Sequence, residues 1–211
     1  MSITTWNWAQ FKGSPECLKW NRRDLLILEE VLQLVPGRRS VVQAGGNLGL
    51  FPKRLAQEFA AVYTFEPDPE LFRIMLQNAP EPNIVRMQAA VGDKPGRVRM
   101  QRGNIKPHGN PHEGTTHVAG EGIIPMMKID DLCLPDVDLI YLDIEGHEPL
   151  ALKGAVETIE FSKPVIVLEI NANLSRIGSS EAELHSQLIA LGYGHSHTIV
   201  SDAVFIHRSK L

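Results

Sequence analysis

A glycine-rich run and a later acidic residue are the first features of this sequence that suggest chemistry. The run from Gln43 to Gly49 separates a short apolar segment from a region with helical character. Glycines there allow a tight turn and a close approach to a ligand, and the free N–H groups of the next helix attract anions. Glu66 lies 20 residues after Gly46. An acidic side chain at that interval can bond the ribose hydroxyls of an adenosine-type cofactor.

Both features also have simpler interpretations. Gly45 and Gly49 can serve tight packing of a strand against a helix, with no ligand involved. Glu66 can be a carboxylate at a helix N-terminus, because Pro67, Asp68 and Pro69 are typical of a helix start.

The pattern fits a mononucleoside cofactor better than a dinucleotide. A G-x-G-x-x-G fingerprint requires glycine at position 44, which is Ala44, and no second mononucleotide-binding half follows. We therefore expect S-adenosyl-L-methionine as cofactor and keep an NAD-type oxidoreductase as the alternative. The expected cofactor-binding residues are Gln43, Gly45, Gly46, Asn47, Gly49, Glu66, Pro67, Ala89 and Asp143.

Ionisable residues gather directly after the apolar segment 137–142. Asp143 ends this segment, and Glu145, His147 and Glu148 follow. If the chain stays extended there, alternation places Asp143, Glu145 and His147 on one side. We expect these three to be catalytic, with His147 as a base, because imidazole titrates near neutral pH. The alternative for His147 and Glu148 is a structural place at a helix start.

Two further groups suggest metal sites less strongly. Asp143 with Glu169 offers the oxygen ligands that magnesium prefers, although hydrogen bonding within the strand-end loops is the simpler interpretation. The segment 103–120 contains three histidines, at positions 108, 112 and 117. It has no hydrophobic period and no cysteine partner, so we expect a lid over the acceptor in preference to a zinc site.

Alternating strands and helices must position these residues. Apolar segments at 40–44, 61–65, 83–91, 137–142 and 164–170 predict buried strands, and helices are predicted at 24–34, 52–59, 69–78, 149–161 and 180–191. Residues 97–101 predict an exposed strand, and 195–200 with 203–207 predict a closing antiparallel pair. The expected fold is α/β and Rossmann-like, with a mostly parallel seven-stranded sheet and helices on both faces. Ligands of such sheets bind at the carboxyl ends of the strands.

Length and composition set limits on function. The chain has 211 residues and a formal net charge of -4. We expect one compact domain at 25–211 behind an N-terminal flap or extension at 1–24. The charge gives no reason to expect nucleic acid as partner. Two distant cysteines, no visible signal sequence and no membrane-length apolar run predict a cytoplasmic location without membrane contact.

These motifs resemble the FkbM family of class I methyltransferases over about residues 25–207. The family's first motif, approximately D-V-G-A-N-x-G, is matched by Gly45, Asn47 and Gly49. Phe65-Glu66-Pro67 and Ala89-Ala90-Val91-Gly92-Asp93 match the next two motifs, and the stretch from Asp138 to Glu148 is the most specific match. Gly46 stands where alanine is usual, and the two departures that bear on function are Gln43 and Tyr141, where aspartate and lysine are usual.

The resemblance implies transfer of a methyl group to oxygen, usually a hydroxyl of a sugar, a glycan or a polyketide-like metabolite. It places Gly45, Asn47 and Gly49 in the cofactor turn and Glu66 on the ribose. From their position after the apolar segment we expect Asp143, Glu145 and His147 to line the reacting side; the alternative for Glu145 and Gly146 is a structural role in the family, fixing the turn. The two departures leave a further alternative open, a family member that binds cofactor without transferring a methyl group.

Overall fold

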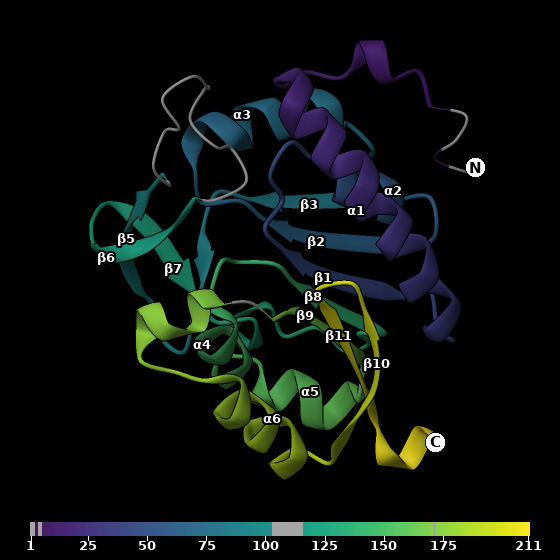
Figure 1. The fold of residues 1–211 in the computed structure, drawn as a ribbon, viewed down its shortest axis with the longest axis vertical. Coiled ribbons are helices and arrows are strands. Elements are labelled where there is room, and N and C mark those ends of the chain that lie inside the picture. Colours follow the sequence, from purple (N-terminus) through teal and green to yellow (C-terminus); the bar gives the residue numbers. More distant parts are fainter. Residues whose placement is uncertain (1–2, 4–5, 103–115, 171) are drawn as a thin grey trace.

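A seven-stranded sheet forms the centre of the molecule (Figure 1). The structure is a computed structural model and describes residues 3, 6–102, 116–170 and 172–211. The strand order is β10-β11-β9-β8-β1-β2-β3. The bounds are β1 Ser40–Ala44, β2 Ala61–Phe65, β3 Ile84–Met87, β8 Leu139–Leu142, β9 Val165–Glu169, β10 Tyr193–Ile199 and β11 Asp202–His207. All neighbours are parallel except β11, which is antiparallel to β9 and β10. The predicted fold class is confirmed.

Helices cover both faces of this sheet (Figure 1). One face carries α1 Pro15–Leu34, α2 Leu50–Leu55 and α3 Pro69–Asn78, and the other carries α4 Glu148–Lys153, α5 Val156–Ser162 and α6 Glu181–Ala190. Successive residues of β1 point to opposite faces. Val41 therefore packs in the core under α1 with Leu28, whereas Val42 packs in the other core with Leu184.

A smaller four-stranded sheet, in the order β4-β7-β5-β6, lies beside the main one. Its strands are β4 Ala90–Val91, β5 Gly96–Gln101, β6 His117–Glu121 and β7 Ile124–Met127. The single strand expected at 83–91 is wrong, because the chain leaves the main sheet after Met87 and enters the small sheet at Ala90. The sequence predicted only β5 of this sheet, and β6 occupies the end of the segment expected to be an irregular loop.

Two predicted helices differ in extent. α1 begins at Pro15, not near residue 24, because Ser14 caps it by accepting a hydrogen bond from the Cys17 N–H at 3.2 Å. The expected division between residues 24 and 25 therefore falls inside a helix. The helix expected at 149–161 is interrupted at Gly154, where a Cβ would lie 2.0 Å from the Gly92 carbonyl oxygen. This close approach to the small sheet ends α4.

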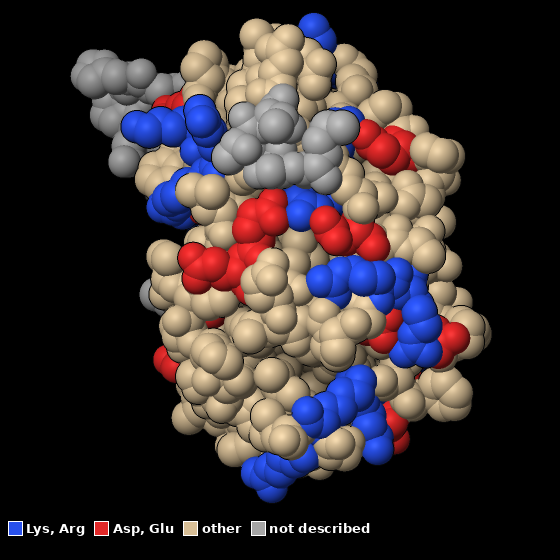
Figure 2. All heavy atoms as spheres, turned by 90° about the vertical axis from the view of Figure 1, so that its right-hand side faces the viewer, with Lys and Arg blue, Asp and Glu red and all other residues tan. Residues whose placement is uncertain are grey.

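Short 3₁₀ helices complete the described chain, at Trp8–Gln10, Asp130–Leu132, Ala172–Ile177 and Arg208–Lys210. Residues 103–115 lie outside the described residues, and with them His108 and His112 of the expected lid. Asn171 also lies outside them. Among the described helices, none combines the length and apolar character that a bilayer crossing requires. Figure 2 shows acidic and basic side chains near one another on one face, without an extended basic stripe.

Candidate functional site

The turn after β1 has the backbone geometry that its glycines predict. Gly45 has a φ of +92°, and a Cβ there would lie 2.0 Å from the Asp143 carbonyl oxygen. Gly49 has a φ of +88°. The N–H groups of Gly45 and Gly46 both donate to the Phe65 carbonyl oxygen, at 3.0 and 2.8 Å. The turn is thereby fixed across the ends of β1, β2 and β8, which is where ligands of such sheets bind.

Glu66 follows β2 and is 4% exposed. One carboxylate oxygen accepts the Asn47 N–H at 2.6 Å, and the other accepts the Asp68 N–H at 2.9 Å. Burial raises the pKa of this carboxyl to about 7, although both N–H groups act in the opposite direction. The N-cap of α3 is Asp68, so one Glu66 oxygen supports the helix start through the Asp68 N–H, while the other holds the glycine-rich turn at Asn47.

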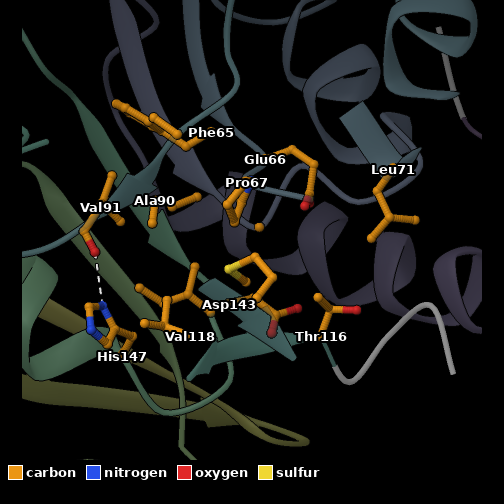
Figure 3. Close-up of a pocket in the computed structure, with 15 residues that line it drawn as sticks. Phe65, Glu66, Pro67, Leu71, Ala90, Val91, Thr116, Val118, Asp143 and His147 are labelled. Atoms are coloured by element: carbon orange, nitrogen blue, oxygen red, sulfur yellow. Dashed lines mark hydrogen bonds between the residues drawn. The ribbon is translucent and has the colours of Figure 1, made fainter. Parts of the chain in front are cut away.

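A pocket opens beside this carboxylate (Figure 3). Its empty volume, which includes open solvent at the mouth, is about 460 Å³. In Figure 3 the Glu66, Asp143 and Thr116 oxygens border the pocket among apolar side chains. The lining residues are Ala44, Gly45, Phe65, Glu66, Pro67, Leu71, Ala89, Ala90, Val91, Met100, Thr116, Val118, Asp143, Ile144 and His147.

The expected cofactor residues divide into two groups. Gly45, Glu66, Pro67, Ala89 and Asp143 line the pocket. The others do not line the pocket but form or support the turn, and they are Gln43, Gly46, Asn47 and Gly49.

Gln43 is one of the supporting residues and is 1% exposed. Its amide N–H donates to the Gly45 carbonyl oxygen at 2.8 Å, and its amide oxygen accepts from the Thr64 hydroxyl at 2.5 Å. Gln43 thus reaches the pocket only through Gly45.

The chain after β8 turns sharply. Glu145 and Gly146 have φ values of +58° and +100°. The prediction that alternation in an extended segment places Asp143, Glu145 and His147 on one side is therefore wrong. Asp143 and His147 both line the pocket. Glu145 instead contacts Asn173, which donates to it, and lies 3.8 Å from Arg176.

Three carboxylates meet at the ends of β8 and β9. Oxygens of Asp143, Glu145 and Glu169 lie within 4.8 Å of one another. Asp143 is open to the pocket yet lies deep among protein atoms. This desolvation, followed by the charges of Glu169 and Glu145, raises the pKa of its carboxyl well above the usual value. Burial also raises the pKa of Glu145 to about 7, against the opposing effect of Arg176. The group therefore favours a shared proton or a bound cation.

Glu148 has a structural place next to this group. It is completely buried, and one of its carboxylate oxygens accepts the N–H of Ile144 at 2.9 Å and of Gly146 at 3.4 Å. These bonds fix the turn that carries Glu145. The helix-start interpretation of Glu148 agrees with this geometry.

His147 is 7% exposed. Its Nδ1 lies 2.9 Å from the Val91 carbonyl oxygen, which only accepts, so Nδ1 carries the proton. Burial lowers the pKa of the imidazole. The ring is therefore neutral at pH 7, and Nε2 is its basic nitrogen.

The small sheet contributes pocket residues that sequence reasoning missed. Met100 of β5 and Val118 of β6 line the pocket, with Thr116 just before β6. The exposed alternation of residues 97–101 was the only visible signal. It predicted a strand but not that Met100 faces a ligand pocket.

Comparisons with solved structures support this fold. The FkbM methyltransferase from Methylobacillus flagellatus KT is 20% identical with a TM-score of 0.54 over 81% of this chain, which spans only 44% of that protein. Magnesium protoporphyrin IX methyltransferase from Synechocystis PCC 6803 has been solved with bound SAM and with bound SAH. The SAM structure is 14% identical, with a TM-score of 0.52 over 95% of this chain and 88% of that one. The SAH structure is also 14% identical, with a TM-score of 0.53 and coverages of 93% and 89%.

A comparison with curated proteins finds no match. A comparison with protein families matches residues 44–194 to the Methyltransferase FkbM domain. This stretch contains the glycine-rich turn, Glu66, the small sheet and the acidic group after β8, and it is well over half of the chain. The chain belongs to the FkbM methyltransferase domain family.

Proposed function

We propose that this protein transfers a methyl group from S-adenosylmethionine to a hydroxyl oxygen of a sugar, a glycan or a small metabolite. The observation that carries the proposal is the buried Glu66 carboxylate, which borders an apolar pocket next to the glycine-rich turn. A carboxylate oxygen accepts more than one hydrogen bond, so Glu66 can hold ribose hydroxyls in addition to its two backbone N–H groups.

The pocket residues fit the separate parts of this cofactor. Pro67, Leu71 and Ala89 belong to the apolar part of the pocket lining, which suits a purine ring. Gly45 and Asp143 lie at the ends of β1 and β8, where we place the methionine part. A Cβ on Gly45 would collide with the Asp143 backbone, so glycine is needed for the turn to sit this close to β8.

The chemistry left to the chain is positioning and proton removal. S-adenosylmethionine, when bound, supplies an activated methyl group on a sulfonium centre. The chain must align the acceptor hydroxyl with that methyl group and take up its proton as the carbon–oxygen bond forms. We assign uptake of the acceptor hydroxyl's proton to Nε2 of His147, because Nδ1 already carries a hydrogen that it donates to the Val91 carbonyl oxygen. Asp143 borders the same pocket and orients the acceptor. Glu145 acts on Asp143 through its charge.

Magnesium at Asp143 and Glu169 stays a prediction. Together with Glu145 they bring three carboxylate oxygens within 4.8 Å, which is the donor chemistry of a hard divalent cation. We place the activity in the cytoplasm, the location that two cysteines far apart in the sequence favour.

Two measurements test the proposal. Calorimetric titration with S-adenosylhomocysteine and with NAD identifies the cofactor class. Incubation with S-adenosylmethionine and hydroxylated acceptors, with magnesium or with EDTA, detects an added methyl group by mass spectrometry. The matched control is Glu66→Gln, which keeps the side-chain size and removes the charge.

We expect S-adenosylhomocysteine to bind the wild-type protein and Glu66→Gln to bind it weakly. Binding of NAD alone would overturn the proposal. Binding of S-adenosylhomocysteine without turnover on any acceptor would support the non-catalytic alternative.

A further inference from the structure

We propose that the N-terminal segment of residues 12–17 is part of the cofactor site, and that Asn78 is the positioning residue through which it acts. The inference rests on the proposed function, because it concerns the same pocket. It assigns a role to a part of the chain whose sequence carries no recognisable motif and which precedes the family match at residue 44.

Asn78 joins this segment to the glycine-rich turn. It is the last residue of α3 and is 4% exposed. Its amide oxygen accepts the Lys12 N–H, and its amide nitrogen donates to the carbonyl oxygens of Lys12 and Leu48, each at 2.8 Å. Both N–H donors of the amide are therefore in use. One uncharged side chain holds the N-terminal segment and the cofactor turn in a fixed relation.

Two further contacts join the same two segments independently of Asn78. A Cβ on Gly13 would lie 2.5 Å from Cδ1 of Leu48, so the segment packs directly on that side chain. The Cys17 thiol donates to the Asn47 side-chain oxygen at 3.7 Å. The segment thus contacts the turn at residues 13 and 17 as well as through Asn78.

Hydrogen bonds extend this contact to the pocket. The Leu48 N–H donates to the Asn47 side-chain oxygen at 2.7 Å, and the Asn47 N–H donates to Glu66 at 2.6 Å. Asn47 has a φ of +46°, a left-handed conformation that asparagine adopts more readily than most other residues. The N-terminal segment therefore contacts the side chain of the residue whose N–H fixes the Glu66 carboxylate at the pocket.

This arrangement has a reciprocal consequence. If the segment stabilises the ligand-binding form of the turn, a bound ligand must stabilise the segment by the same free energy. The effect can be followed on the unmodified protein by amide hydrogen exchange of residues 12–17, with and without S-adenosylhomocysteine.

The variant that tests the inference is Asn78→Asp. It keeps the side-chain shape but replaces both N–H donors with an oxygen that faces two carbonyl oxygens. Asn83→Asp is the matched control, because the Asn83 amide also donates to two backbone carbonyl oxygens, those of Ala56 and Phe59, each at 2.9 Å. Asn83 precedes β3, at the end of the sheet opposite to the pocket.

We expect Asn78→Asp to bind S-adenosylhomocysteine about tenfold more weakly than the wild type, a difference of about 1.4 kcal/mol. We expect Asn83→Asp to lose comparable thermal stability and to keep wild-type affinity. In the wild type, S-adenosylhomocysteine should slow exchange at residues 12–17. If Asn78→Asp does not fold, this exchange measurement decides alone.

Two results would overturn the inference while leaving the proposed function intact. One is equal affinity of Asn78→Asp and Asn83→Asp for S-adenosylhomocysteine. The other is ligand binding to the wild type with unchanged exchange at residues 12–17. If the wild type binds no S-adenosylhomocysteine, the proposed function fails first, so the two failures are distinguishable.

Discussion

The ionisation of Glu66 makes the affinity for S-adenosylhomocysteine depend on pH. Burial raises the pKa of this carboxyl to about 7, against the backbone N–H groups of Asp68 and Asn47. Ribose hydroxyls are donors and bond more strongly to a carboxylate than to a carboxylic acid. We therefore expect the ionised form to be the one that binds the ligand.

The size of the effect follows from the pKa. A group with a pKa of about 7 is about one-tenth ionised at pH 6 and about nine-tenths ionised at pH 8. The apparent Kd equals the intrinsic Kd divided by the competent fraction. The Kd should therefore be about tenfold lower at pH 8 than at pH 6.

The same group affects stability in the opposite direction. Its pKa in the folded protein lies above the ordinary value of 4.5, so the folded state retains the proton after the unfolded state has lost it. The contribution of Glu66 to the free energy of unfolding is therefore fully present below pH 4.5 and is lost as the pH rises through about 7. A bound ligand should reduce this loss, because ribose hydroxyls stabilise the ionised form.

Isothermal titration of the wild type and of Glu66→Gln between pH 6 and pH 8 measures the effect. Glutamine does not ionise, so any slope that comes from the ligand or from other groups appears in both proteins. The wild type should show the additional tenfold change. Parallel curves for the two proteins would refute the reasoning, since they would mean that Glu66 does not titrate on binding.

Three further substitutions have definite expected outcomes. His147→Gln should lower kcat by a factor of about 10²–10⁴, the usual contribution of a general base, and should leave the Kd for S-adenosylhomocysteine unchanged. If the initial rates of the variant equal those of the wild type, another group takes up the proton. Gly45→Ala should lower the free energy of unfolding, measured in urea, by about 1–3 kcal/mol. The added Cβ would lie 2.0 Å from the Asp143 carbonyl oxygen, and the residue would have to adopt a left-handed conformation. If the variant unfolds at the same urea concentration as the wild type, the turn can shift to accommodate the Cβ. Tyr141→Phe removes the hydroxyl that donates to Asp202, whose pKa is raised to about 6 mainly by burial. The substitution should lower the free energy of unfolding by about 1–3 kcal/mol. The loss should be larger at pH 8 than at pH 5, because an ionised Asp202 loses a stronger hydrogen bond than a protonated one. Equal losses in urea unfolding at the two pH values would contradict this expectation.

The main sheet could be predicted because most of its strands, and the helices between them, have recognisable patterns in their own sequence. Ser40 to Ala44 is a buried strand that leads into glycines, and Pro69 opens a helix at the expected residue. The small sheet was missed because its strands are short and partly exposed and because they pair over long distances. β4 has two residues, and β6 contains Gly120 and polar residues with no period. Such strands depend on their partners and not on their own sequence.

The site was predicted best where a backbone motif fixes a side chain. Glu66 and Pro67 line the pocket because they directly follow a parallel strand. Glu145 does not line it, because positive φ values at Glu145 and Gly146 break the alternation that the sequence suggested. The pocket wall from Met100 and Val118 depends on where the small sheet packs. That placement is tertiary and leaves no local signal.

Gln43 and Tyr141, the two departures from the family pattern that bear on function, are each matched by a partner elsewhere in the fold. An aspartate at position 43 could only accept hydrogen bonds and would face the Gly45 carbonyl oxygen with a negative charge. Gln43 donates to that oxygen and accepts from Thr64, so its amide suits both neighbours. Tyr141 is 2% exposed and donates to the buried Asp202. Because each substitution keeps its surroundings hydrogen-bonded, both are compatible with cofactor binding, which the catalytic and the non-catalytic alternatives share.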